Sequence, residues 1–227
     1  IEEKDLIEAP ESRMYHFSGT QHGAGTLAPD DVGPDGSVGM YKFNVVDYRP
    51  LLRASLINLD KWTTDDILPP PSSCPRISDG TAIKPEILID KVKNVIDINT
   101  PDPEKVWLIR RVDMGKRAHE GIGRFPAEEF ETYQNFVSNI DDDGNETGGI
   151  RLPDLTVPLG SHFGWNLRHP DTKEPDQQIA MQGISIFFET SKENRENKSD
   201  NRLSIQERYQ SKQDFIDKVK EETNKLL

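Results

Sequence analysis

The chain has 227 residues, of which 30% are charged and 33% hydrophobic, and its mean hydropathy is −0.71. This length is enough for one large domain or two small ones with a buried core. A formal net charge of −12 argues against nucleic-acid binding, which needs a basic surface, and predicts repulsion from anionic membranes. No run approaches the ~20 apolar residues of a membrane-spanning helix, so no membrane span is expected.

The first predicted element is a short strand that leads into a glycine-rich loop carrying a histidine. Met14, Tyr15 and Phe17 are good strand formers, and Gly19 ends the run. His22 follows at once. A histidine just beyond a strand end has a fixed backbone and an accessible imidazole. From these residues alone, His22 is either the general base of a hydrolase or an ordinary loop residue.

A polar loop over residues 23–39 follows, and it leads to the clearest helix of the first half of the chain. Asp47 suits the N-cap position and Pro50 is tolerated in the first turn, so the helix is expected to begin there and to end near residues 63–64. Its apolar side chains recur at helical spacing and are expected to form a buried face, made of Leu52, Leu56, Leu59 and Trp62.

The middle of the chain, residues 85–136, has poor periodicity. Residues 87–89 and 106–109 have the character of short strands, and residues 126–136 have the acidic start of a short helix. The single cysteine, Cys74, lies in the preceding proline-rich loop. It excludes an internal disulfide, and a structural role is expected for it.

An acidic turn over residues 141–145 joins two extended runs, residues 136–140 and 149–152, which predicts a β-hairpin. Asn139, Asp141, Asp143 and Gly144 also match positions 1, 3, 5 and 6 of a calcium-binding loop in residue type. The twelfth position of such a loop must be a bidentate Glu, and here it is Ile150. The hairpin is therefore the preferred interpretation, and no metal is expected.

An aromatic segment that contains Trp165 lies between His162 and His169. No regular ligand spacing links these histidines to another His or Cys, so a zinc site is not expected. Trp165 either lines a pocket, in which Arg168 would hold a carboxylate, or is buried. Residues 179–188 form a further extended run.

The end of the chain is predicted to be helical. Ser204 and Glu207 have the spacing of a capping box, and a second helical segment begins at Ser211. The apolar residues of this segment form one stripe, which consists of Phe215, Ile216, Val219, Thr223 and Leu226.

A hydrolase histidine needs a nucleophile, and the sequence contains no Gly-x-Ser-x-Gly elbow. The nearest segment, residues 35–39, has Asp35 in place of the first glycine of that motif. The chain opens with Ile1, and residues 1–11 have the character of a connection entering a strand. A fragment or a processed chain is therefore expected.

An ordered set of motifs runs through most of the chain. It consists of residues 13–23 (RMYHFSGTQHG), 47–54 (DYRPLLRA), 59–62 (LDKW), 70–72 (PPS), 75–76 (PR), 79–81 (DGT), 149–153 (GIRLP), 164–168 (GWNLR) and 207–209 (ERY) with Ser211. Together these motifs resemble the C-terminal half of a bacterial family of large α/β-hydrolase domain proteins, mostly uncharacterised esterases. The resemblance is weakest between residues 85 and 135.

The resemblance implies a serine hydrolase of the α/β class, whose catalytic residues come in the order Ser, acid, His. The chain would be the C-terminal portion of that fold. Residues 1–80 would hold the last core strand, the histidine loop and the last core helix. Residues 81–203 would be a mixed strand and loop extension packed on the core, and residues 204–227 a C-terminal helical segment. His22 matches the family's histidine, and the nucleophile and acid would lie upstream.

The function implied by the resemblance is cleavage of a carboxylic ester or related acyl bond in a small molecule, with Gln21, Gly23 and Trp165 near the substrate. The expected partner is the missing N-terminal part of the hydrolase, because this chain alone lacks a nucleophile and is expected to be inactive. No metal or organic cofactor is implied, and the compartment is left open. The alternative is a non-catalytic binding domain, secreted or cytoplasmic, in which His22 is incidental.

Overall fold

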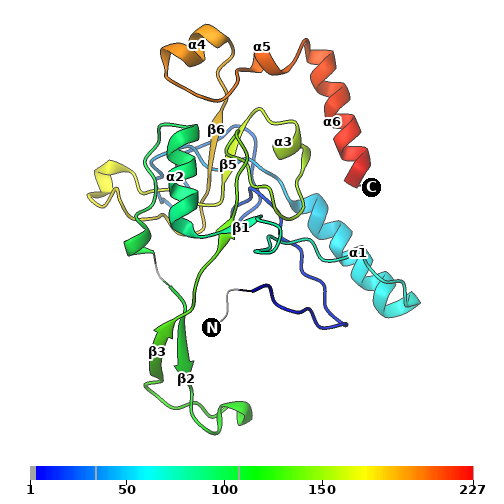
Figure 1. The fold of residues 1–227 in the computed structure, drawn as a ribbon, viewed down its shortest axis with the longest axis vertical. Helices are drawn as coiled ribbons and strands as arrows, with labels where there is room; N and C mark the ends of the chain where they lie inside the picture. Colours follow the sequence, from blue (N-terminus) through cyan, green and yellow to red (C-terminus); the bar gives the residue numbers. More distant parts are fainter. Residues whose placement is uncertain (1–3, 34, 107, 227) are drawn as a thin grey trace.

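The computed structural model describes residues 4–33, 35–106 and 108–226. Figure 1 shows a loop-rich central body from which three elements extend, namely α1 (Arg49–Asp65), α6 (Lys212–Leu226) and the hairpin of β2 (Arg110–Asp113) and β3 (Glu128–Thr132). The shorter helices are α2 (Pro85–Val95), α3 (Pro153–Thr156), α4 (Lys192–Asn197) and α5 (Ile205–Arg208), with 3-10 turns at Pro103–Lys105, Ala118–Glu120 and Pro170–Thr172. This mixed helix and strand content fits an α/β fold.

The strands of the described residues form three two-stranded antiparallel sheets, which are β1 (Ala82–Ile83) with β4 (Val137–Ser138), β2 with β3, and β5 (Gly160–Phe163) with β6 (Ile184–Phe187). The β5–β6 pair lies at the centre of the body, and all four residues of β5 are buried. The predicted first strand makes two isolated parallel bridges, Tyr15 with Ser73 and Phe17 with Ile150.

Two groups of buried apolar side chains form the core. In the first, α2 contributes Val92, and Ile96 just beyond its end joins it against Phe163 and Ile184 of the central sheet. The second consists of Val46, Leu152 and Leu155. The extended run predicted at residues 179–188 therefore supplies core residues through β6.

Three predictions of secondary structure between residues 85 and 152 are wrong. Residues 87–89 lie inside α2, because Pro85 occupies the first helical turn, where its ring favours a helix. Residues 126–136 contain β3, because they pair with β2 along the chain. Ile150 makes a parallel bridge to Phe17, so residues 149–152 do not form the second strand of the predicted hairpin, whose turn is closed by the bridge of Ile140 with Glu146. Residue 107 of the predicted strand 106–109 lies outside the described residues, and β2 begins only at Arg110.

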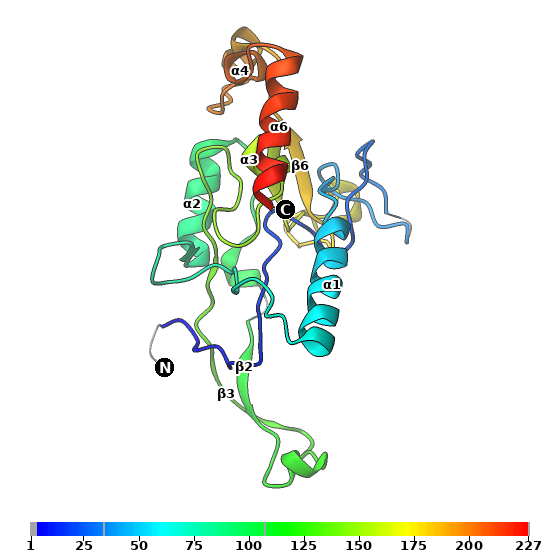
Figure 2. The same ribbon diagram turned by 90° about the vertical axis from the view of Figure 1, so that its right-hand side faces the viewer.

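The helix predicted after Asp47 is confirmed as α1, although its N-cap is Tyr48 and not Asp47. Its predicted buried face is wrong. Leu52, Leu56 and Leu59 are 50%, 68% and 51% exposed. The face that turns toward the body carries the half-buried Trp62, whose ring lies 5.1 Å from the Arg13 guanidinium carbon. Figure 2 shows α1 standing along the side of the molecule. Its apolar stripe therefore points away from the body.

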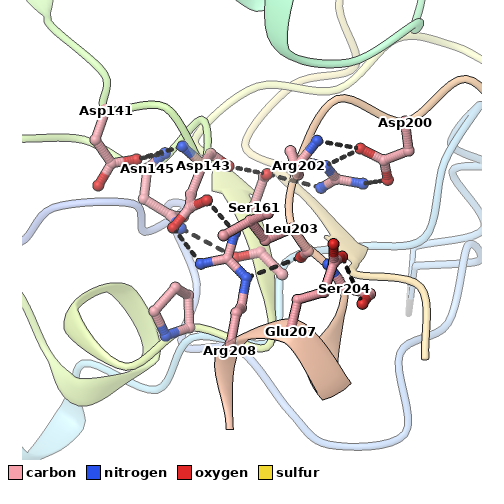
Figure 3. A network of polar contacts seen from close by, with 12 residues as sticks. Asp141, Asp143, Asn145, Ser161, Asp200, Arg202, Leu203, Ser204, Glu207 and Arg208 are labelled. Atoms are coloured by element: carbon pink, nitrogen blue, oxygen red, sulfur yellow. Dashed lines mark hydrogen bonds and ion pairs between the residues drawn. The ribbon is translucent and has the colours of Figure 1, made fainter. Parts of the chain in front are cut away.

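The C-terminal segment is tied to the body by a network of buried ion pairs (Figure 3). The Arg202 side chain is 1% exposed and donates to both carboxylate oxygens of Asp200, to Ser161 Oγ and to the Ile186 carbonyl. The Arg208 guanidinium pairs with the Asp143 carboxylate in the acidic turn. The capping box predicted at the start of this segment is confirmed at α5. Within the described residues, no helix has the length and apolar character needed to cross a bilayer.

Candidate functional site

The backbone around His22 is anchored from several sides. Asn44 Nδ2 donates to the carbonyl oxygens of Gly19 and Phe163, at 2.8 and 3.1 Å. Gln21 Oε1 accepts from the Gly183 amide at 2.8 Å, and the Tyr48 hydroxyl donates to the His22 carbonyl oxygen. These bonds come from segments far apart in the chain. Together they fix the path of the loop on both sides of His22.

Two glycines let this loop pass close to the body. Gly19 has a φ of +64°, and a Cβ at this position would lie 2.7 Å from Leu155 Cδ2. Gly25 donates to the Val46 carbonyl at 2.9 Å, and a Cβ there would overlap the Val45 backbone. Gly23, between them, has open space around it. The loop is therefore tightly packed at its ends and open next to His22.

The imidazole of His22 is exposed to solvent. Among the described residues, no side chain forms a hydrogen bond with its ring nitrogens, although the His22 backbone is held. A fixed backbone with a free, accessible imidazole is what a general base needs before its nucleophile is in place. The described part of the chain brings neither a serine nor a carboxylate to this ring.

The structure places Trp165 in the wall of a cavity of about 510 Å³. The cavity lies between α2 and the base of the β2–β3 hairpin, and most of its lining is apolar. Trp165 also packs on Phe163, with ring centroids 5.3 Å apart. Gln21, His22 and Gly23 are not part of the lining. Trp165 therefore lies in a pocket, as one of its two predicted placements, but in a pocket that is separate from the His22 loop.

The sequence was compared with models of known families, with curated proteins and with solved structures. A family model described as alpha/beta hydrolase domain matches residues 3–227. The chain belongs to the alpha/beta hydrolase domain family. No curated protein and no solved structure matches the sequence significantly. Membership in this family confirms the expected resemblance and indicates a hydrolase-type function.

One histidine–carboxylate pair of this hydrolase-family chain was missed by the sequence reasoning. His16 Nε2 lies 2.5 Å from Glu146 Oε2, and the buried Ser18 hydroxyl donates to the Gly148 carbonyl nearby. These partners are 130 residues apart in the sequence, so no spacing pattern could have indicated them. They attach the segment that leads to His22 to the acidic turn, which is a positioning role.

The histidine at position 162 is buried in the central sheet and has a structural environment. Its Nδ1 forms a hydrogen bond of 2.8 Å with Ser185 Oγ, which also accepts from the Val45 amide. Burial, assisted by the positive charge of Arg202, lowers the pKa of His162 to about 4. Among the described residues, no group of three or more His, Cys, Asp or Glu side chains is placed to hold a metal ion.

Proposed function

We propose that this chain supplies the catalytic histidine of a serine hydrolase that cleaves a carboxylic ester or a related acyl bond. The observation that carries the proposal is the contrast at His22. The loop backbone is anchored by Asn44, Gln21 and Tyr48, whereas the imidazole is exposed and has no partner among the described side chains. In a protein of the hydrolase family, this contrast suits a general base better than an incidental loop residue.

In the proposed mechanism, His22 removes the proton from a serine hydroxyl as the serine attacks the ester carbonyl. It then gives this proton to the leaving alkoxide, and it repeats both steps when water hydrolyses the acyl-enzyme. A carboxylate would hold the imidazole in the correct tautomer. The serine and the carboxylate would belong to an upstream part of the hydrolase, and this chain would be the C-terminal portion of the fold.

The exposed face of α1 supports this division. Leu52, Leu56 and Leu59 form a stripe along one side of the helix, and each is at least half exposed. In an α/β fold, the apolar stripe of a helix packs against a sheet. We therefore propose that this stripe receives the sheet of the upstream part, which would bring its serine and acid to His22.

The structure supports a place near the substrate for Gln21 and Gly23 but not for Trp165. Gln21 is held by the Gly183 amide beside His22, and Gly23 leaves open space there for a substrate to approach. The loop of residues 23–39 would border the mouth of the active site. Trp165 lines a different cavity, so a contact between it and the substrate rests on the sequence prediction alone.

The test is labelling of the full protein with a fluorophosphonate probe, together with hydrolysis of a chromogenic short-chain ester. His22→Ala is expected to lower both rates by at least ~10³-fold, because the serine loses its base. His169→Ala is the matched control, since His169 is also a partly exposed histidine but lies outside the anchored loop. The proposal is contradicted if the wild-type protein takes up no probe, or if the His22→Ala variant keeps its activity. The remaining hypothesis is then a non-catalytic binding domain.

A further inference from the structure

A β-hairpin projects from the body of the molecule, as both Figure 1 and Figure 2 show. It consists of residues 109–133, here called the arm, and contains β2 and β3. Every residue of these two strands is exposed. The strands are held to each other by their ladder and by exposed ion pairs such as Arg111 with Glu131. An isolated two-stranded hairpin is marginally stable in water, so the arm is an element that needs a partner.

The far end of the arm, residues 114–125, combines apolar and basic side chains and is here called the tip. Phe125 is 98% exposed, and Met114 and Ile122 within the same segment are also exposed. Three basic residues and one acidic residue give the tip a formal net charge of +2. The whole chain carries −12, so the rest of the chain is strongly acidic. Charge complementarity therefore favours the body of another copy as the partner of the tip.

The base of the arm forms one wall of the 510 Å³ cavity. Thr132 and Tyr133 of the arm, together with the adjoining Leu108 and residues 134–137, line it on one side. Leu88, Ile89 and Trp165 line it from the body. The lining contains one basic and one acidic residue, Lys84 and Glu86, and its other residues are uncharged. Cavities of this size are large enough to bury several side chains. The cavity therefore suits the apolar side chains of the tip, and the acidic charge that attracts the tip belongs to the rest of the chain.

We propose that two copies of this chain pair through antiparallel arms, with the tip of each arm seated in the apolar cavity at the base of the other. A two-fold axis across the arms brings each tip to the cavity at the base of the partner's arm. The same contact is then made twice, and the assembly stops at a dimer. Phe125 is the anchor of each contact, because an exposed aromatic side chain that fills a pocket supplies much of an interface's binding energy. The pairing also covers the exposed apolar side chains along both strands.

The test is the mass of the full chain in solution, measured by sedimentation equilibrium over a wide concentration range. The wild-type chain is expected to dimerise. Phe125→Asp in the tip and Leu108→Asp in the cavity are each expected to raise the dimer dissociation constant by at least ~30-fold. Leu27→Asp is the matched control, because Leu27 is 85% exposed and lies outside the arm and the cavity lining, and it should leave the dimer intact. Circular dichroism checks that all three variants are folded.

Mixing the two variants tests whether the contact is reciprocal. A heterodimer of the Phe125→Asp and Leu108→Asp chains keeps one undamaged tip in one undamaged cavity, so the mixture should associate more tightly than either variant alone. A wild-type chain that is monomeric at every concentration overturns the proposal. So does a dimer that survives both substitutions, or a mixture that associates no better than its parents.

Discussion

At the scale of single residues, the neutral imidazole of His162 in the central sheet makes stability depend on pH. The ring forms a hydrogen bond with Ser185 Oγ, and the charged group that acts on it is the Arg202 guanidinium rather than a carboxylate. Burial and the nearby Arg202 guanidinium lower its pKa from 6.5 to about 4. The unfolded chain therefore binds a proton at this residue below about pH 6.5, whereas the folded chain does so only near pH 4.

This difference predicts how stability depends on pH. Because the unfolded state binds more protons between pH 6.5 and pH 4, the free energy of unfolding falls as the pH falls through this window. The part due to His162 is roughly 2 kcal/mol between pH 7 and pH 5. Urea denaturation of the wild type and of His162→Gln at both pH values checks it. The substitution should remove that part of the pH dependence, and two equally steep profiles would contradict the assignment.

At the scale of the element, the loop that carries His22 is shaped by two glycines with opposite surroundings. A Cβ at Gly25 meets the Val45 backbone, whereas a Cβ at Gly23 meets nothing within 4 Å. Gly25→Ala is expected to displace the loop and break its hydrogen bond to the Val46 carbonyl, at a cost of about 1–3 kcal/mol. Gly23→Ala should leave the free energy of unfolding unchanged.

The two alanine variants are compared by chemical denaturation and by ester hydrolysis. Gly25→Ala should lose stability and activity together, because the loop that positions His22 moves. Gly23→Ala should lose activity alone if the substrate passes over Gly23, as predicted. Equal stability of wild type and Gly25→Ala would show that the loop is not held in the way described.

The elements that the sequence predicted correctly are those specified by neighbouring residues. The capping box of Ser204 with Glu207 and the early proline of α1 act within one helical turn, so they are visible in the sequence. Residues 87–89 were assigned as strand from three apolar side chains, although the deciding signal was Pro85 just before them. The pairing of Ile150 with Phe17 was not predictable, because it joins segments more than 130 residues apart.

In the candidate site, too, local features were predictable from the sequence and long-range contacts were not. The glycine-rich setting of His22 was readable, and the structure adds the bonds from Asn44 and Tyr48 that hold it. For Trp165 the sequence left open a pocket or the core, and the structure shows that it lines a pocket and packs on Phe163 of the core. The His16–Glu146 pair left no local pattern. Long-range partners are therefore what sequence reasoning missed in both fold and site.

At the scale of the whole molecule, many large apolar side chains of the described residues are exposed, although the chain has a net charge of −12. Two surfaces account for many of them, namely the α1 stripe and the arm. Exposed contiguous apolar surface usually marks an interaction site. The two surfaces lie on different elements and are proposed to serve different partners, the upstream part of the hydrolase and a second copy of the chain.

The role of the α1 stripe gives the last prediction. In the full protein, Leu56→Asp is expected to lower the free energy of unfolding by about 1.5–3 kcal/mol, because a leucine buried against the upstream sheet becomes a buried carboxylate. Ester hydrolysis should fall with it, since the serine and His22 are no longer held together. Ile87→Asp is the matched control, because Ile87 is half exposed on another helix, α2. Equal denaturation midpoints and equal activities of these two variants would show that the α1 stripe faces solvent in the full protein as well.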